Sequence, residues 1–362
     1  MKDLLIEARN KIDTIDKEMA KLFVERLKAS EMVAKYKQEH GLKILDPIRE
    51  AEVIKRNSEA VEEDVYREYY VNFQKHTMSL SRAYQARLLE GMKVAYAGTE
   101  GAYAHLAAMK LFPTSQAVAC GSFDEAYAAV ENGECDIAVL PIENSYNGDV
   151  GQVSDLMFSG PLYVNTVTEL AISHDLLAPK GTKLEDITTV ISHPQALGQC
   201  HGYIVNKGYS EIEFANTALA AKYVADNGDG KTAAIASREA ANIFGLEVLA
   251  TNINESSSNT TRFAVFSRSE NKNSTTDKRV HTILLFTVRH EAGALAKALE
   301  IIAKYGFNMG ALRSRPMKEL LWHYYFYIEA EGNLDSEDGK KMLSELKQYC
   351  DRLKTVGSYT VV

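Results

Sequence analysis

The hydrophobic and polar positions of the first 90 residues follow a helical pattern. Residues 3–38 contain no glycine or proline, and their apolar side chains recur in steps of three and four, which predicts one helix about 50 Å long. Gly41 ends it, and Asp46 and Pro47 are typical of the cap and first residue of a second helix. A third helix is predicted from about residue 64 to 90. The first helix is too long for a 90-residue monomeric domain to cover, so we expect it to pair with a second chain.

One charged residue interrupts the apolar stripe of this long helix. The step of four after Leu22 reaches Arg26, where another apolar residue is expected. A buried guanidinium is costly unless it has an anionic partner. One interpretation of Arg26 is a buried ion pair or a coiled-coil register device, and the other is an anionic ligand inside the bundle. Lys37 lies three turns further on nearly the same face, and Ser81 and Gln85 share a face of the third helix. These groups favour a polyanionic ligand that carries a hydroxyl.

From residue 91 onward the pattern changes to short apolar runs that alternate with helical segments. "KVAYAG", "AVACG" and "CDIAVLPIEN" predict strands of a parallel α/β sheet. Long extended segments at "LYVNTVTELAIS" and "TTRFAVFS" favour two lobes joined by crossover strands. After a polar linker the pattern predicts strand, helix, strand, strand, helix and strand, the ferredoxin-like order of an α+β domain. We therefore predict a multidomain chain with an all-α domain, an α/β domain, a linker and an α+β domain at residues 1–91, 92–268, 269–279 and 280–362.

Composition narrows the class of protein. The 362 residues are 46% hydrophobic and 25% charged, and no apolar run approaches the roughly 18–20 residues of a membrane helix. The charged N-terminus lacks the apolar core of a signal peptide, so we expect a cytoplasmic protein without a membrane partner. A net charge of −8 argues against nucleic-acid binding. The four cysteines form no CxxC pair and indicate reduced thiols, and with no HExxH or GxGxxG motif we expect no metal and no cofactor.

The first domain resembles the all-helical chorismate mutase family in "EARNKIDTID", "ERLKASEMVAKYK", "LDPIRE" and "LSRAYQ". The resemblance implies an intertwined homodimer that rearranges chorismate to prephenate. Such a reaction needs no nucleophile or base, only a compact substrate conformer and stabilised charge on the breaking C–O bond. The implied pocket has Arg26, Lys37 and the partner chain's Arg9 on the two carboxylates, Glu50 on the ring hydroxyl, Lys37 and Gln85 on the ether oxygen, and Asp46, Arg49 and Ser81 around them.

Polar clusters mark the ends of two predicted strands and the start of a third in the second domain. They comprise Glu143 and Asn144, then Ser192, His193 and Gln195, then Thr261 and Arg262. Ligands of parallel sheets bind at the carboxyl ends of strands, which makes these residues candidates for a site. By spacing alone, Thr261 also fits a hydroxyl-to-backbone turn, and Ser192 with His193 fits a helix cap.

These clusters lie in motifs that resemble the prephenate dehydratase family: "AYAGTEGAYAHLAA", "PIENSYNG", "SHPQALGQC" and "TTRFAVFS". The resemblance implies two lobes like those of a periplasmic binding protein, with the pocket in the cleft. It implies Thr261 as the catalytic hydroxyl and the other six residues as its surroundings. Prephenate would lose CO₂ and its ring hydroxyl together. The family often has serines where this chain has Ala102 and Ala104, which removes two hydroxyls from the expected site.

The last domain resembles ACT regulatory domains in its element order and in two motifs. The first motif is Gly293, Ala294 and Leu295, where backbone amides at a helix start can receive a carboxylate. The second contains Asn308 and the run Ser314, Arg315 and Pro316. Arg313 stands where the family usually has glutamate, so we expect altered amino-acid affinity or selectivity. A purely structural dimerisation module is the alternative.

Taken together, the chain resembles the bifunctional chorismate mutase/prephenate dehydratase family. The resemblance implies a homodimer or tetramer of phenylalanine biosynthesis that acts on chorismate and prephenate and is inhibited by phenylalanine. The competing interpretation is a non-enzymatic small-molecule sensor with a dimerising helical domain. Incubation with chorismate, followed by an assay for phenylpyruvate, distinguishes the two.

Overall fold

The chain divides into two compact units, one ending at Met92 and the other beginning at Lys93. Residues 271–279 of the predicted linker lie outside the residues that the structure describes. This computed structural model describes residues 2–256, 258–270, 280–317, 320 and 323–362. Among these residues, no helix combines the length and the apolar character that crossing a bilayer requires.

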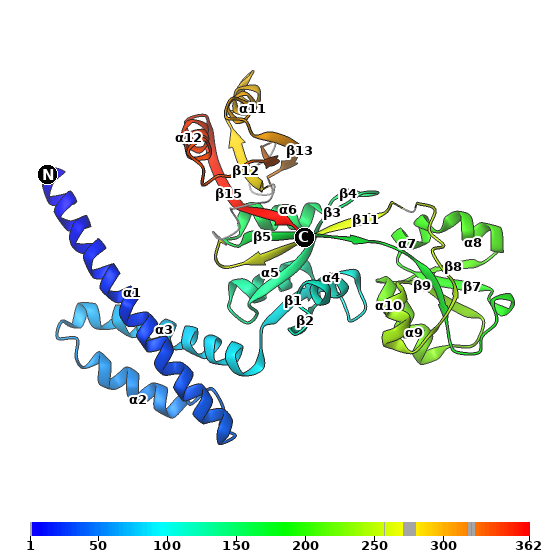
Figure 1. The fold of residues 1–362 in the computed structure, drawn as a ribbon, viewed down its shortest axis with the longest axis horizontal. Helices are drawn as coiled ribbons and strands as arrows, with labels where there is room; N and C mark the ends of the chain where they lie inside the picture. Colours follow the sequence, from blue (N-terminus) through cyan, green and yellow to red (C-terminus); the bar gives the residue numbers. More distant parts are fainter. Residues whose placement is uncertain (1, 257, 271–279, 318–319, 321–322) are drawn as a thin grey trace. The chain divides into compact units, whose positions relative to one another are not determined.

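The first unit contains the three predicted helices: α1 (Lys2–Glu39), α2 (Pro47–Ser58) and α3 (Asp64–Glu90) (Figure 1). Asp46 caps α2, because its Oδ1 accepts a hydrogen bond from Arg49 N at 3.0 Å. α3 packs against both other helices. The buried residues of this unit are few and lie mostly on α3, where Thr77, Met78, Ser81 and Gln85 are covered. The bundle therefore encloses polar side chains in a region that a helical core normally fills with apolar ones.

The apolar stripe of α1 is largely uncovered within this unit. Leu5, Ile12, Ile15, Met19 and Leu22 are between 44% and 63% exposed. Contiguous exposed apolar surface of this kind marks an interaction face on a soluble protein. The prediction that α1 pairs with a second chain stays a prediction, and this exposed stripe is the surface it would use.

The second unit begins with an α/β segment built on two sheets (Figure 1). The first sheet contains β1 (Lys93–Ala97), β2 (Gln116–Cys120), β3 (Ile137–Asn144), β4 (Gly148–Asp149), β5 (Tyr163–Ala171) and β11 (Thr260–Ser267), with helices α4 (Tyr103–Leu111), α5 (Phe123–Glu131) and α6 (Gly151–Ser159). The second contains β6 (Asp175–Ala178), β7 (Thr189–Ser192), β8 (Ser210–Glu213), β9 (Thr232–Ala236) and β10 (Glu247–Ala250), with η1 (Leu184–Asp186), α7 (Pro194–Gln199), α8 (His201–Lys207), α9 (Thr217–Asn227) and α10 (Arg238–Phe244). Two lobes therefore form.

The sheets are mixed, whereas strand–helix alternation predicts parallel ones. β1, β2 and β3 are parallel, as are β7, β8 and β9. In contrast, β11 is antiparallel to β3 and β5, and β6 is antiparallel to β9 and β10. The chain leaves the first lobe through β5 and returns to it through β11, so these neighbouring strands run in opposite directions. The same holds for β6, which enters the second lobe, and β10, which leaves it.

The C-terminal segment continues the first sheet. It contains β12 (His281–Val288), α11 (Ala294–Lys304), β13 (Asn308–Pro316), β14 (Tyr324–Glu331), α12 (Glu337–Leu346) and β15 (Cys350–Val361). The order of its strands is β13-β14-β12-β15, and β15 joins β5 through Thr360 and Val361. Phe158 of α6 stacks on Tyr325 of β14 with ring centroids 4.3 Å apart. The two segments therefore share one sheet of ten strands and part of one hydrophobic core.

Candidate active sites

A pocket of about 160 Å³ opens among the three helices of the first unit. Most of its lining residues are charged or polar, which is unusual for the interior of a small bundle. It brings together all the residues predicted for the first site except Arg9, namely Arg26, Lys37, Asp46, Arg49, Glu50, Ser81 and Gln85. The pocket also contains Ser30, Val53 and Arg82, which the sequence did not single out.

Two cations of this pocket, Arg26 and Lys37, donate to neutral acceptors. Arg26 donates to the Ser81 hydroxyl and, at 3.5 Å, to Thr77 O, and no carboxylate pairs with it among the described residues. Lys37 Nζ donates to Ile44 O at 2.5 Å. Gln85 is 7% exposed, and its Oε1 lacks a hydrogen-bond partner among the described residues. A buried polar atom without a partner is costly, so the pocket suits a ligand with both anionic and hydrogen-bonding groups.

Among the described residues of this pocket, Glu50 is the carboxylate that forms an ion pair with a cation. Arg82 of α3 donates to both of its oxygens, at 2.6 Å to Oε2. This ion pair fixes the carboxylate at the pocket wall. Arg82 lies within the motif "LSRAYQ", directly after Ser81. This position was the feature of the sequence that could have identified it as a residue of the pocket.

Arg9 lies outside this pocket. It is exposed on α1, 17 residues before Arg26 on the same uninterrupted helix, which places it about 25 Å away along the axis. Arg9 therefore cannot contact the pocket of its own chain. The predicted role of Arg9 requires a second chain.

A second pocket, of about 470 Å³, is lined by residues from both lobes of the α/β segment. Of the predicted residues, it contains Asn144, His193, Gln195 and Thr261. Ala102 and Ala104 line it with methyl groups where the family often has hydroxyls. The sequence missed Tyr103, His174, Gln199, Asn216 and Thr217, which also line it.

The second pocket receives positive potential from helix ends rather than from side chains. The described lining residues include no lysine or arginine. Helices α4 and α9 begin at its wall with Tyr103 and Thr217. Helix N-termini favour anions, because their backbone N–H groups are unpaired and the helix dipole is positive there. A carboxylate can thus bind here without a cationic side chain.

Thr261 lies at the start of β11, 9% exposed, and its hydroxyl is bonded to a side chain rather than to a backbone turn. Asn144 Nδ2 donates to Thr261 Oγ at 2.9 Å. Asn144 is oriented by the backbone N–H groups of Tyr146 and Asn147, which both donate to its Oδ1 at 3.0 Å. Because Thr261 Oγ accepts from Asn144, its own proton is available to donate into the pocket.

The same polar chain extends to the second lobe. Asn144 Nδ2 also donates to Asn259 Oδ1 at 2.8 Å, and Asn259 Nδ2 donates to Gln199 Oε1 at 3.0 Å. His174 Nε2 lies 2.9 Å from the same Gln199 oxygen, so this ring nitrogen carries the proton. Burial lowers the pKa of His174 below its ordinary value of 6.5, so its imidazole stays neutral near pH 7. The chain fixes donor and acceptor directions across the cleft.

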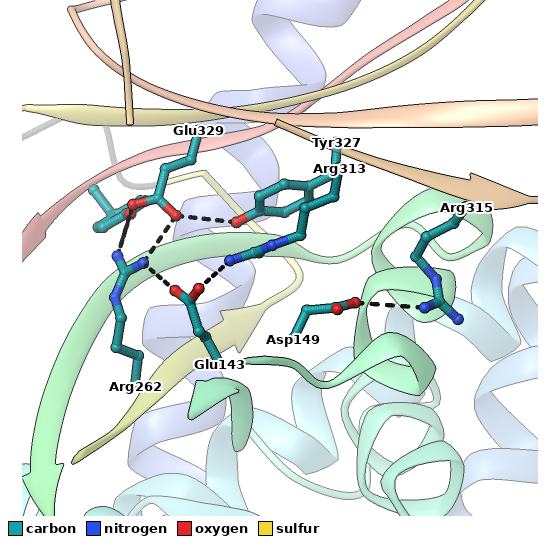
Figure 2. Close-up of polar contacts among 8 residues, drawn as sticks. Glu143, Asp149, Arg262, Arg313, Arg315, Tyr327 and Glu329 are labelled. Atoms are coloured by element: carbon teal, nitrogen blue, oxygen red, sulfur yellow. Dashed lines mark hydrogen bonds and ion pairs between the residues drawn. The ribbon is translucent and has the colours of Figure 1, made fainter. Parts of the chain in front are cut away.

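The other three residues predicted for this site lie elsewhere. Ser192 is fully buried and donates to Ile235 O at 2.6 Å. Glu143 and Arg262 pair with each other at 3.0 Å and with residues of the C-terminal segment, and neither lines the pocket (Figure 2). His193 caps α7 through Nδ1, as the alternative interpretation predicted, and it also lines the pocket.

The residues predicted for regulation are divided among several places in the C-terminal segment. Gly293, at φ +85°, and Ala294 line a pocket of about 230 Å³ at the start of α11. Leu295 and Ser314 line a larger one of about 880 Å³. Asn308 and Pro316 are the end residues of β13 and line neither of these pockets.

The arginines of β13 point toward the α/β segment. Arg313 pairs with Glu143, and Arg315 Nε donates to Asp155 Oδ1 at 3.0 Å (Figure 2 shows both arginines). In the residues that the structure covers, no group of three His, Cys, Asp or Glu side chains could hold a metal ion, and the four cysteines are free.

Comparisons with known proteins match both units. The family model for chorismate mutase type II matches residues 8–86, and the model for prephenate dehydratase matches residues 94–271. The chain is 34% identical over 360 residues to a bifunctional chorismate mutase/prephenate dehydratase of Neisseria gonorrhoeae, covering 99% of this chain and 97% of that protein. It is 38% identical to arogenate dehydratase 2 of Petunia hybrida over 282 residues, 74% of this chain and 71% of that protein. A solved prephenate dehydratase of Arthrobacter aurescens in complex with L-Phe aligns with TM-score 0.69 and 26% identity, covering 74% of this chain and 90% of that one.

Proposed function

Since this chain belongs to the bifunctional chorismate mutase/prephenate dehydratase family, we propose that its two activities reside in the two pockets described above. The protein is an enzyme of phenylalanine biosynthesis that rearranges chorismate to prephenate and then converts prephenate to phenylpyruvate. The helical pocket around Arg26 carries the first reaction. The pocket around Thr261 carries the second.

In the helical pocket, Arg26 and Lys37 hold the substrate carboxylates and fold chorismate into its compact reactive conformer. The single observation that supports this assignment is the guanidinium of Arg26, half-buried in the bundle with no carboxylate beside it among the described residues. Gln85 presents a polar atom without a protein partner to the same space. As the C–O bond breaks, negative charge grows on the ether oxygen, and Lys37 with the amide of Gln85 stabilises it. Glu50, fixed by Arg82, accepts from the ring hydroxyl.

Each mutase pocket is completed by Arg9 of a second chain. Support comes from the exposed apolar stripe of α1 and from the distance between Arg9 and Arg26 along the same helix. A homodimer, or a tetramer built from it, buries that stripe. Mixing an Arg9→Ala variant with an Arg26→Ala variant tests this arrangement, because mixed dimers contain one pocket with neither substitution. Mutase activity that returns on mixing supports the shared pocket, whereas two variants that stay inactive after subunit exchange contradict it.

In the dehydratase pocket, Thr261 donates a hydrogen bond to the ring hydroxyl that leaves. Decarboxylation releases CO₂, the electron pair of the broken C–C bond moves into the ring, and the hydroxyl departs and takes up a proton to become water. Negative charge therefore disappears at the carboxylate and appears at the leaving oxygen. The pocket matches this change, because the described lining offers helix ends and no cationic side chain, while a hydroxyl donor is held by Asn144.

Purified protein incubated with chorismate, and separately with prephenate, tests both assignments. Phenylpyruvate should form from either substrate. Arogenate is tested in parallel, because the relatives include arogenate dehydratases. If prephenate accumulates from chorismate and is not consumed, the dehydratase assignment is wrong, and absence of both products leaves only the sensor interpretation.

The C-terminal segment is an ACT domain with ferredoxin-like topology, through which phenylalanine inhibits the dehydratase. Its order of strand, helix, strand, strand, helix and strand supports the assignment, together with the L-Phe in the structure of the related dehydratase. The amides at the start of α11, near Gly293, offer a place for the amino-acid carboxylate. The enzyme works in the cytoplasm. Calorimetric titration with phenylalanine tests the regulation. The absence of both binding heat and inhibition at millimolar phenylalanine would refute it.

A further inference from the structure

The ladder between β3 and β11 carries two different pairs of side chains on its two faces. Asn144 is the register partner of Thr261, and Glu143 is the register partner of Arg262. Successive side chains of a strand point to opposite faces of the sheet. Asn144 and Thr261 line the dehydratase pocket, and Glu143 and Arg262 meet the C-terminal segment on the other face. One face of this short stretch of ladder thus carries the donor hydroxyl of Thr261. The other face carries a contact between the α/β segment and the C-terminal segment.

Four charged side chains form this contact (Figure 2). Arg262 donates to Glu143 at 3.0 Å and to the two oxygens of Glu329 at 2.7 and 3.0 Å. Arg313 donates to the second oxygen of Glu143. The exposed fractions of these side chains run from 8% for Glu329 to 27% for Glu143. With two positive and two negative charges, the group is balanced and only partly hydrated.

The two residues from the C-terminal segment are themselves held in place. Tyr327 and Tyr359 donate to the two oxygens of Glu329, at 3.2 Å from Tyr327. The guanidinium carbon of Arg313 lies 5.1 Å from the centre of the Tyr327 ring. Burial disfavours the charge of Glu329, yet its bonds to Arg262 outweigh this and lower its pKa, so the carboxylate is ionised at neutral pH. The group therefore has one defined arrangement.

We propose that Arg313 and Glu329 are positioning residues of the dehydratase, which hold Glu143 and Arg262 and thereby set the place of Asn144 and Thr261 on the opposite face. The inference rests on the proposed function of the Thr261 pocket. It also gives Arg313 a role in this chain other than contact with an amino-acid ligand. A catalytic donor that moves by about 1 Å loses on the order of a hundredfold in rate, so a partial loosening should cost about tenfold.

The experiment compares two arginines of β13 whose side chains share a face of the strand. Arg313→Met removes the bond to Glu143. The matched control Arg315→Met removes bonds to Asp155 of α6 and Asp149 of β4, and it leaves the Glu143–Arg262 pair intact. Dehydratase kcat and KM are measured with prephenate, and mutase turnover of the same sample reports the protein concentration. We expect Arg313→Met to lower kcat about tenfold with KM within twofold, and Arg315→Met to lower kcat less than threefold. Arg313→Lys, which keeps the charge, should lie between Arg313→Met and the unsubstituted protein.

A cycle with Glu143→Gln shows whether Arg313 acts through Glu143. In that background, Arg313→Met should change kcat by less than twofold, while the effect of Arg315→Met should be the same in both backgrounds. Equal losses of kcat from Arg313→Met and Arg315→Met would overturn the inference. So would a double variant whose loss of kcat equals the product of the losses from Arg313→Met and Glu143→Gln alone. So would a kcat unchanged by Arg313→Met. Absence of dehydratase turnover in the unsubstituted protein would instead refute the proposed function.

Discussion

Replacing Thr261 with valine separates the role of its hydroxyl from its role in folding. Valine keeps the β-branched shape that fits the start of β11. The lost partner is the Nδ2 of Asn144, which still reaches Asn259 Oδ1 at 2.8 Å and Thr260 O at 3.3 Å, so no buried donor is left unpaired. The folding cost is therefore one hydrogen bond, about 1 kcal/mol. The β3–β11 ladder should persist.

The catalytic cost should be much larger than the folding cost. A donor directed at the oxygen where charge develops contributes about 3–4 kcal/mol, or roughly 100- to 1,000-fold in kcat. We expect that loss for Thr261→Val, with prephenate KM nearly unchanged. Thr261→Ser keeps the oxygen that accepts from Asn144 and should lose less than about tenfold in kcat. These effects differ by enough to rank the variants without correction for small changes in stability.

The assay follows phenylpyruvate formation from supplied prephenate and compares it with mutase turnover of the same preparation. Mutase rates should stay unchanged, because the Arg26 pocket lies in a different unit. Thermal unfolding of each variant shows whether the second unit is intact. A Thr261→Val protein with kcat within threefold of the unsubstituted enzyme would refute the argument and leave Thr261 as a residue that only supports the strand.

Three further predictions concern other parts of the chain. Arg26→Ala should abolish mutase turnover of chorismate and leave dehydratase activity on prephenate unchanged; a variant that unfolds yet keeps normal turnover per folded dimer would indicate that Arg26 only supports the bundle. The free energy of unfolding of the second unit should fall as pH drops below about 6.5, because burial lowers the pKa of His174 and the unfolded chain then binds more protons. The free energy of unfolding should fall further below about pH 4.5, because the pKa of Glu329 is lowered in the folded protein and this carboxylate then takes up a proton. Denaturant titrations on His174→Asn should show a weaker dependence of the free energy of unfolding on pH near pH 6. Arg313→Glu should lower the melting temperature of this unit, because it places a second carboxylate against Glu143.

Local patterns predicted the helices and strands well. The bounds of the third helix, Asp64–Glu90, and the cap at Asp46 follow from short-range rules of spacing and capping, and the structure confirms both. The mixed character of the two sheets could not be predicted in this way. It depends on where the chain crosses between lobes, which is a property of the tertiary fold rather than of local periodicity.

The candidate sites were predictable as clusters but not as directions of side chains. Asn144 and Thr261 face the pocket, while their neighbours Glu143 and Arg262 face away, because strands alternate. Which residue of each pair faces inward depends on register. His174 gave no signal, since a lone histidine after a strand is common and its partner Gln199 is 25 residues further on. Arg313 likewise could not be assigned, because Glu143 lies 170 residues earlier.

The strand β15 makes the C-terminal segment hard to detach from the enzyme. Most of its residues, from Cys350 to Tyr359, pair with β12, while Thr360 and Val361 pair with β5 of the first sheet. A cut in the linker before β12 would therefore produce two fragments with complementary open strand edges, at β5 and at β15, rather than two independent modules. Such fragments should be prone to aggregate when made alone. Made together, they should find each other and rebuild the continuous sheet, so that this enzyme can be divided at the linker only as a complementing pair.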